Sequence, residues 1–227
     1  SLGPPTTMTL VVRQPGDEGF PPSGTCVRYF VGANSPRGHL LPTVIGAHKL
    51  ARRARELGAT TTVLDTTGLI SPAQAGGVLK QAKVDLLQPM AVFAIQRGAE
   101  LEPLLLPLRR SARTLVVDLP TASAVRCRDV STRRAHRAAG FRRYFADAGP
   151  LEVNWPRLAV FPGPLFSRGR LVALEDVHGF ALALGVVLKV DAARRVVLLH
   201  TPARSLQGVD ALRLGDLWLD PETCCEV

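Results

Sequence analysis

The residues best suited to chemistry form one short run, Asp65-Thr66-Thr67-Gly68, in which a carboxylate, two hydroxyls and a glycine are adjacent. The run begins at the end of the stretch TTTVLD, which starts at Thr60, ends with Asp65, and is β-branched and nearly continuously apolar. Such a stretch is typical of a parallel strand that is covered on both faces. Ligands of open α/β sheets bind at the carboxyl ends of parallel strands, so the sequence predicts a ligand-binding edge here.

The spacing of Asp65 and Gly68 fits the pattern D-x-x-G, which follows a strand in P-loop GTPases. There the aspartate helps to hold Mg²⁺, and the glycine amide contacts the γ-phosphate. A four-residue pattern with two fixed positions also arises by chance. The chain has no G-x-x-x-x-G-K-[ST] phosphate loop, and AIQRGAE stands where a GTPase would have N-K-x-D. A GTPase-type switch protein therefore stays open as one alternative.

A second group with chemical potential is a cluster of arginines in residues 121–149. It comprises Arg126, Arg128, Arg133, Arg134, Arg137, Arg142 and Arg143. Ser131 or Thr132 is suited to cap a helix that runs from there to about Ala146. Several arginines on a short helix after the last strand of a sheet suit a lid over phosphates, because guanidinium binds phosphate as a planar fork. Spacing alone favours the simpler alternative, a solvated basic helix face.

Composition and charge point to an anionic partner. The 227 residues contain 28 Lys+Arg against 19 Asp+Glu, a formal net charge of +9, and only four of the basic residues are lysines. This balance favours a nucleotide or nucleic acid, although a high-GC genome also enriches arginine. A non-catalytic nucleic-acid-binding or assembly module is therefore a further alternative. The four cysteines and five histidines lack metal-site spacing, so no metal site is predicted in this chain. The chain has no signal peptide and no apolar run of membrane-spanning length, so we expect no membrane association and a cytoplasmic location.

Strands and helices alternate in the first two thirds of the chain, which predicts an α/β fold with a mostly parallel sheet and flanking helices. The predicted strands are 10–12, 27–32, 60–65, 89–96 and 114–119, and helices are predicted over 41–57 and after Ser71-Pro72. From Leu151 onward short β-rich runs take over, with a hairpin turn at Asp191–Arg194. We therefore expect a core domain over residues 1–149, with the arginine lid at about 121–149, and a small C-terminal β domain over residues 150–227.

Several stretches, taken in order, resemble the polynucleotide 5′-hydroxyl kinases of the P-loop class. These are relatives of the kinase subunit of the mRNA 3′-end cleavage factor and of the rRNA-processing kinases. DTTGL is similar to the family motif (Asn/Asp)-Thr-x-Gly-(Trp/Leu), and FVGANSPRGH to its Gly-Ser-Thr-(Thr/Ser)-Pro turn. The other similar stretches are GPPTTMTL, QPMAVFAIQRGAELEPLL, LPTASAVRCRDVSTRRAHRAAGFRRYF and GVVLKVDAARRVVLLHTPA.

The resemblance implies a role for several residues. The two lid arginines of the family fall on Arg128 and Arg133, which would brace the transferring phosphoryl group. Thr66, Thr67 and Gly68 would form a clasp near the acceptor or the γ-phosphate, with Leu69 where many relatives have Trp. The remaining implied contacts are with the nucleic-acid backbone (Asn34, Ser35) and with the nucleotide (Asp65, Gln96, Pro120, Ser123).

The resemblance also implies the reaction and its partners. It predicts transfer of the γ-phosphate of ATP, with Mg²⁺, to the 5′-hydroxyl end of RNA or DNA, as in RNA processing. The phosphate-loop lysine, the Mg²⁺-binding Ser/Thr and the Walker B aspartate of the family have no counterpart in these residues. We therefore expect a P-loop fold that is incomplete at its N-terminus, a fragment of a longer kinase, and no activity from the 227 residues alone.

Overall fold

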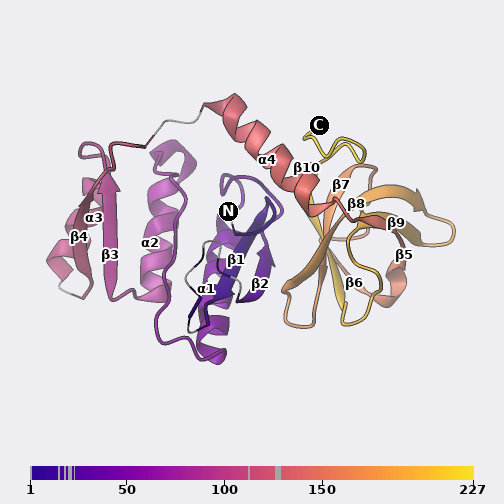
Figure 1. Cartoon of the computed structure of the whole chain (residues 1–227), viewed down its shortest axis with the longest axis horizontal. Coiled ribbons are helices and arrows are strands. Elements are labelled where there is room, and N and C mark those ends of the chain that lie inside the picture. Colours follow the sequence, from indigo (N-terminus) through magenta and orange to yellow (C-terminus); the bar gives the residue numbers. More distant parts are fainter. Residues whose placement is uncertain are drawn as a thin grey trace. The chain divides into compact units, whose positions relative to one another are not determined.

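The computed structural model describes residues 2–14, 16–17, 19, 22, 24–111, 113–125 and 129–227 (Figure 1). It is a mixed α/β structure, as expected, and it packs as two compact units. One unit combines Ser1–Ser35 with Asp129–Val227, and the other comprises Pro36–Arg128. None of the helices in these described ranges is long and apolar enough to cross a membrane.

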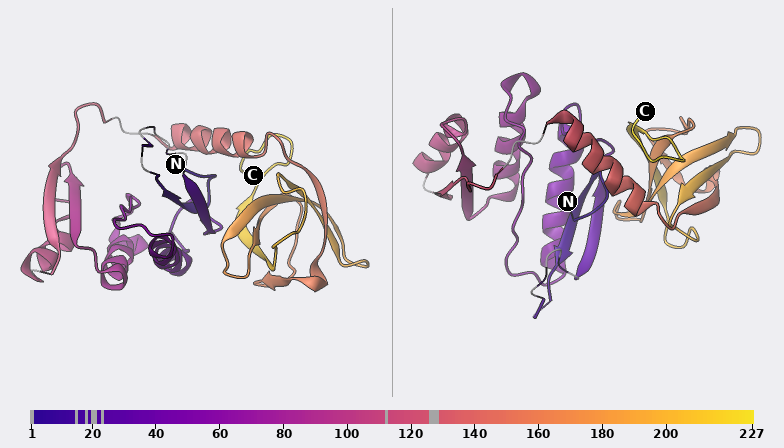
Figure 2. Two further views of the ribbon diagram at one scale, coloured as in Figure 1. Left: turned by 60° about the horizontal axis from the view of Figure 1, so that its bottom comes forward. Right: turned by 45° about the horizontal axis from the view of Figure 1, so that its top comes forward.

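Six strands in the C-terminal part form a single curved sheet. They are β5 (Gly149–Asn154), β6 (Ala159–Phe161), β7 (Arg170–Glu175), β8 (Ala181–Asp191), β9 (Val196–Thr201) and β10 (Ala211–Trp218), with a short 3-10 helix η2 (Trp155–Arg157) after β5. The strand order is β5-β9-β8-β7-β10-β6, and only the β10–β6 pair is parallel. The sheet curls into a half-barrel (Figure 2). The β-rich character predicted for this part of the chain is confirmed.

The β8–β9 connection is the hairpin turn predicted from the sequence. The Asp191 carboxylate accepts a hydrogen bond of 2.9 Å from the backbone N–H of Arg194. Arg195 then adopts a left-handed conformation with φ 54° before β9 starts. Aspartate is favoured in such turns because its side chain can hydrogen-bond the backbone a few residues further on.

Helix α4 (Val130–Tyr144) belongs to the same unit as the half-barrel. Phe141 is fully buried and Phe145 is almost fully buried, in one core with Phe30 from β2 and with Leu171 and Val186 of the sheet. The Tyr144 hydroxyl accepts a 2.9 Å hydrogen bond from the backbone N–H of Leu184. The run FRRYF at the end of the arginine-rich segment therefore anchors the helix to the sheet.

The first two strands form a hairpin. β1 (Thr7–Val12) and β2 (Thr25–Phe30) pair in antiparallel register from Thr7 opposite Phe30 to Val12 opposite Thr25. A mostly parallel sheet was predicted for this part of the chain, and this antiparallel pair does not belong to one. Parallel neighbours need a crossover connection, usually a helix, and the sequence between Val12 and Thr25 is rich in Gly and Pro, which disfavour one.

The second unit contains four helices and a two-stranded parallel sheet. Its elements are α1 (Leu40–Glu56), the 3-10 helix η1 (Pro72–Gln74), α2 (Gly76–Leu87), β3 (Ala91–Gln96), α3 (Glu102–Ser111) and β4 (Leu115–Pro120). β3 and β4 are parallel and joined by α3, and α1 packs against α2 (Figure 1). Among the described residues of this unit, the β3–β4 pair is the part of the predicted mostly parallel sheet that is present.

The strand predicted over residues 60–65 is not present. The segment is extended but unpaired, and its side chains are exposed, with Val63 at 90%. β-branched residues favour a pleated surface that neighbouring strands cover. Strand geometry needs a partner for the backbone N–H and C=O groups, and no described strand pairs with this segment. The segment therefore has the apolar and β-branched residues of a strand, but no described strand pairs with it.

The two compact units differ from the consecutive domains predicted from the sequence. β1, β2 and α4 join the half-barrel because Phe30, Phe141 and Phe145 share its core. The boundary between residues 149 and 150 was placed where the sequence changes from helical to β-rich texture. Side chains that are distant in sequence share this core. The hydrophobic periodicity of a short segment gives no information about such long-range contacts.

Asp129 is the residue that caps α4, in place of the predicted Ser131 or Thr132. Its carboxylate accepts hydrogen bonds from the Thr132 backbone N–H at 2.6 Å and from the Ser131 hydroxyl at 2.8 Å. Both predicted caps thus lie inside the helix and donate to the true cap. These bonds, the one from the Thr132 backbone foremost, lower the pKa of Asp129 to about 2.

We expect the start of α4 to depend on pH in a predictable direction. Because the folded pKa is depressed, the cap contributes stability above about pH 4, the ordinary value of an aspartate, and loses it as the pH falls toward about 2. An NMR titration should show the Thr132 amide shifting with a midpoint near 2. Asp129→Asn keeps the acceptor oxygen and should remove this titration. A midpoint near 4 would mean that the carboxylate is not hydrogen-bonded as described.

Candidate functional site

The predicted clasp is held by a lysine from α2. The Lys80 ammonium donates to the Thr67 carbonyl oxygen at 2.6 Å and to the Thr66 hydroxyl oxygen at 3.3 Å. Residues 65–68 are all exposed, and Gly68 has open space where a Cβ would lie. The clasp is therefore an accessible loop whose conformation is fixed by a cation, and not the end of a strand.

The backbone of Gly76, at the start of α2, lies close to the backbone of Leu69, which follows the clasp. A Cβ on Gly76, the first residue of the helix, would lie 2.7 Å from the Leu69 carbonyl group. Real Cβ atoms do not approach backbone so closely, so a glycine is needed at this point. Leu69, at the position where many resembling kinases have Trp, is half-buried beside this contact.

Three other predicted residues meet at the carboxyl edge of the β3–β4 sheet. Gln96 and Pro120 are the last residues of the two strands and lie opposite each other, and Ser123 is exposed in the turn that follows β4. The Gln96 amide donates to Glu102 at 2.7 Å and accepts from the Leu101 backbone N–H at 3.1 Å. The structure therefore brings these three residues to one edge, with the Gln96 side chain engaged at the start of α3.

The arginines of α4 divide into two kinds. Arg133 lies in the first turn and is exposed. Its backbone N–H donates to the Asp129 carbonyl oxygen at 3.2 Å, while its guanidinium forms no hydrogen bond or ion pair with a described residue. Arg142 and Arg143 are exposed at the other end of the helix. Arg134 and Arg137 have structural partners, described below. Arg128, the second predicted lid residue, lies outside the described residues.

Glu226 contacts several of the candidate residues, and the sequence analysis did not predict these contacts. Its carboxylate accepts from Arg137 at 2.6 and 3.2 Å and from the Asn34 amide at 3.0 Å, and its carbonyl oxygen accepts from Arg134 at 2.7 Å. The predicted nucleic-acid contact Asn34 is thus tied to α4, while Ser35 beside it is exposed. A lone glutamate near the C-terminus carries no local pattern that points to such a pairing.

Side chains of the metal-ligating types are scattered over the described residues. These residues contain no group of three or more His, Cys, Asp or Glu side chains that could hold a metal ion. The sequence has no phosphate loop of the G-x-x-x-x-G-K-[ST] type either. The candidate features among the described residues are therefore a clasp, a sheet edge and a basic helix.

Comparison with known families gives a match over most of the chain. Residues 1–147 match the family model described as the mRNA cleavage and polyadenylation factor CLP1 P-loop. The chain belongs to the CLP1 P-loop family. The resemblance inferred from DTTGL and the arginine-rich segment is confirmed at the level of this family.

Several archaeal polyribonucleotide 5′-hydroxyl-kinases are similar to the chain. A polyribonucleotide 5′-hydroxyl-kinase of Thermococcus kodakarensis is 26% identical, covering 98% of this chain and 65% of its own. A second, from Pyrococcus abyssi, is 25% identical, covering 93% of this chain and 74% of its own. The chain thus spans about two thirds of the length of the Thermococcus relative.

Solved structures of Clp1p show the same fold. A wild-type Clp1p–Pcf11p complex matches with a TM-score of 0.63 at 11% identity, covering 96% of this chain and 64% of that one. A structure of the extended interface between Pcf11p and Clp1p in a point mutant matches with the same TM-score at 10% identity. The CLP1-like fold therefore extends beyond residue 147, through the half-barrel.

Proposed function

We propose that these residues belong to an ATP-dependent polynucleotide 5′-hydroxyl kinase and supply its acceptor and lid side. The observation that carries the proposal is the similarity to polyribonucleotide 5′-hydroxyl-kinases over 98% of the chain, together with membership of the CLP1 P-loop family. RNA or DNA with a free 5′-hydroxyl is the acceptor, and ATP with Mg²⁺ is the donor. The exposed clasp and the basic helix support this assignment, because both suit anionic, extended substrates.

The proposed reaction joins the 5′-hydroxyl oxygen to the γ-phosphorus as the bond between that phosphorus and the β–γ bridging oxygen breaks. The hydroxyl proton passes to a base, a role that the resemblance gives to the Walker B aspartate of the family, for which these residues have no counterpart. Negative charge spreads over the equatorial oxygens of the transferring group. In the proposal, Arg133 and Arg128 stabilise that charge, and Thr66, Thr67 and Gly68 hold the acceptor end. Asp65, Gln96, Pro120 and Ser123 contribute nucleotide contacts, and Asn34 and Ser35 backbone contacts.

A phosphorylation assay tests the proposal. The natural protein should transfer labelled phosphate from ATP to a 5′-hydroxyl oligonucleotide and should not label an oligonucleotide whose 5′ end is blocked. The 227 residues alone, which lack a phosphate loop, should give no turnover. GTP hydrolysis without transfer would favour the switch protein, and oligonucleotide binding without nucleotide binding would favour the assembly module. Turnover by the 227 residues alone would show that the donor site has been misassigned.

A further inference from the structure

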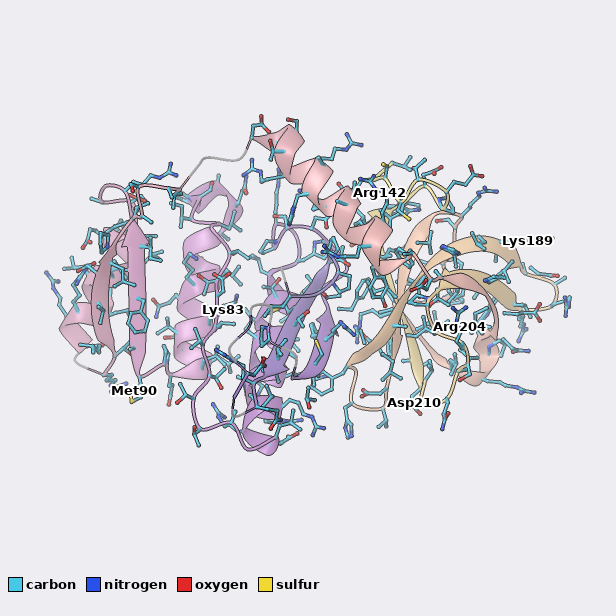
Figure 3. The ribbon with its side chains drawn as sticks, in the orientation of Figure 1. Lys83, Met90, Arg142, Lys189, Arg204 and Asp210 are labelled. Carbon is cyan, nitrogen blue, oxygen red and sulfur yellow. The ribbon has the colours of Figure 1, made fainter. Side chains whose placement is uncertain are left out.

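Lys83 is a cation in an unusual place. It lies on α2 one turn after Lys80, and its residue is only 6% exposed, although its side chain ends in an amino group. Figure 3 shows Lys83 on the side of α2 where α1 lies. Lysine is almost never buried without a partner, because taking an ammonium out of water is costly.

No partner for this ammonium occurs among the described residues. The structure has no hydrogen bond or ion pair to Lys83, in contrast to Lys80, which binds Thr66 and Thr67. Its nitrogen is not among the fully enclosed unpartnered atoms, which are those of Thr9, Arg28 and Asn34. The charged tip therefore keeps access to solvent at the end of a buried stem, and all three of its donors remain available.

The surrounding charges make the position electropositive. Burial lowers the pKa of Lys83, the charge of Lys80 lowers it further, and Asp65 acts in the opposite direction. Burial likewise lowers the pKa of Lys80, with Asp65 again opposing. When both lysines are protonated, two ammonium groups and one carboxylate leave a net charge of about +1, which one singly charged anion would balance and would itself favour. Lysine is a frequent phosphate ligand and acts there as a point charge.

We propose that Lys83, with the remaining donor of Lys80, binds a backbone phosphodiester of the acceptor strand next to the Thr66–Gly68 clasp. The inference rests on the proposed function, because that function supplies the acceptor. A phosphodiester carries one negative charge, which matches the net positive charge of Lys80, Lys83 and Asp65, whereas the triphosphate of ATP carries several negative charges. Lys80 is the positioning residue, since two of its three donors already fix the clasp. Lys83 is the residue that touches the phosphate.

The test compares Lys83→Met, Lys80→Met and Lys189→Met in the natural protein. Lys189 is exposed on β8 in the other unit, so the third variant makes the same charge change as a matched control. Binding of single-stranded 5′-hydroxyl and 5′-phosphorylated RNA is measured by fluorescence anisotropy at several salt concentrations. Binding of ATP is measured by calorimetry, and thermal melting checks that each variant is folded.

Lys83→Met should weaken binding of both RNAs by roughly tenfold at 0.1 M salt and lower the salt slope by about 0.7, the value for one phosphate contact on a single strand. Lys189→Met should change neither, and ATP affinity should stay within about twofold in every variant. If Lys83→Met is unstable, Lys83→Gln, which removes the charge and keeps a polar tip, supplies the same readout. Lys80→Met should also lower RNA affinity, through the clasp that Lys80 positions.

Two outcomes would overturn the inference. RNA binding by Lys83→Met equal to that of the Lys189→Met control would show that the buried lysine has no phosphate to hold. Loss of ATP affinity with RNA binding intact would assign the site to the donor nucleotide. Neither readout requires phosphoryl transfer, so a failed kinase assay with a normal Lys83 effect would refute the proposed function and leave this site standing.

Discussion

Arg133→Ala in the natural protein is expected to lower kcat by at least about 100-fold while RNA affinity stays within about twofold. Removing one preorganised donor to a developing negative charge typically costs about 100- to 1,000-fold in kcat, and an arginine that braces a transferring phosphoryl group can contribute more. Arg133 is an exposed arginine in the first turn of α4 whose guanidinium forms no hydrogen bond or ion pair with a described residue, so its removal leaves no buried group unsatisfied. Single-turnover rates and anisotropy binding curves give the two quantities.

Arg143→Ala is the matched control for that experiment. Arg143 is exposed on the same helix and loses the same charge, but it lies in the last turn. Arg133→Lys separates charge from shape, because lysine keeps the charge and loses the planar fork. A fall in RNA affinity with kcat unchanged for Arg133→Ala would identify α4 as a solvated basic face that only attracts nucleic acid.

The sequence predicted the elements of this chain better than their pairing. Alternating apolar runs located β8, β9 and the turn at Asp191–Arg194, because period-two patterning and turn residues are local signals. The same kind of signal at residues 60–65 predicted a strand that has no partner in the structure. Pairing depends on which other strands lie nearby, and a single run of residues carries no information about them.

The candidate site shows the same division between local and distant information. The motif at Asp65–Gly68 was visible in the sequence, but its tie to Lys80 joins residues 13 and 14 positions apart. Lys83 stands four residues after the buried Leu79, on the apolar face of the helix, and a lysine at a core-facing position is a signal that could have been used. The Glu226 pairing with Arg137, 89 residues away, had no such signal.

Phe141→Ala is expected to destabilise the unit that contains the half-barrel by about 3–5 kcal/mol, the usual range for removing a buried phenylalanine ring. Phe141 is fully buried, and its ring centroid lies 6.5 Å from that of Phe145. Urea unfolding followed by circular dichroism measures the change. The same substitution at Phe161, which is 48% exposed, should cost less than about half as much.

The form of the Phe141→Ala transition matters as much as its midpoint. The side chain joins α4 to the sheet residues Leu171 and Val186 in one core. If the helix and the sheet unfold as one cooperative unit, the whole transition should move to lower urea with its slope unchanged. Phe141→Leu, which restores part of the volume, should recover part of the loss. Melting of the helix alone, with the sheet transition unmoved, would show that Phe141 does not couple α4 to the half-barrel. Arg133, the proposed lid residue in the first turn, would then lack the rigid support that stabilisation of a phosphoryl group needs.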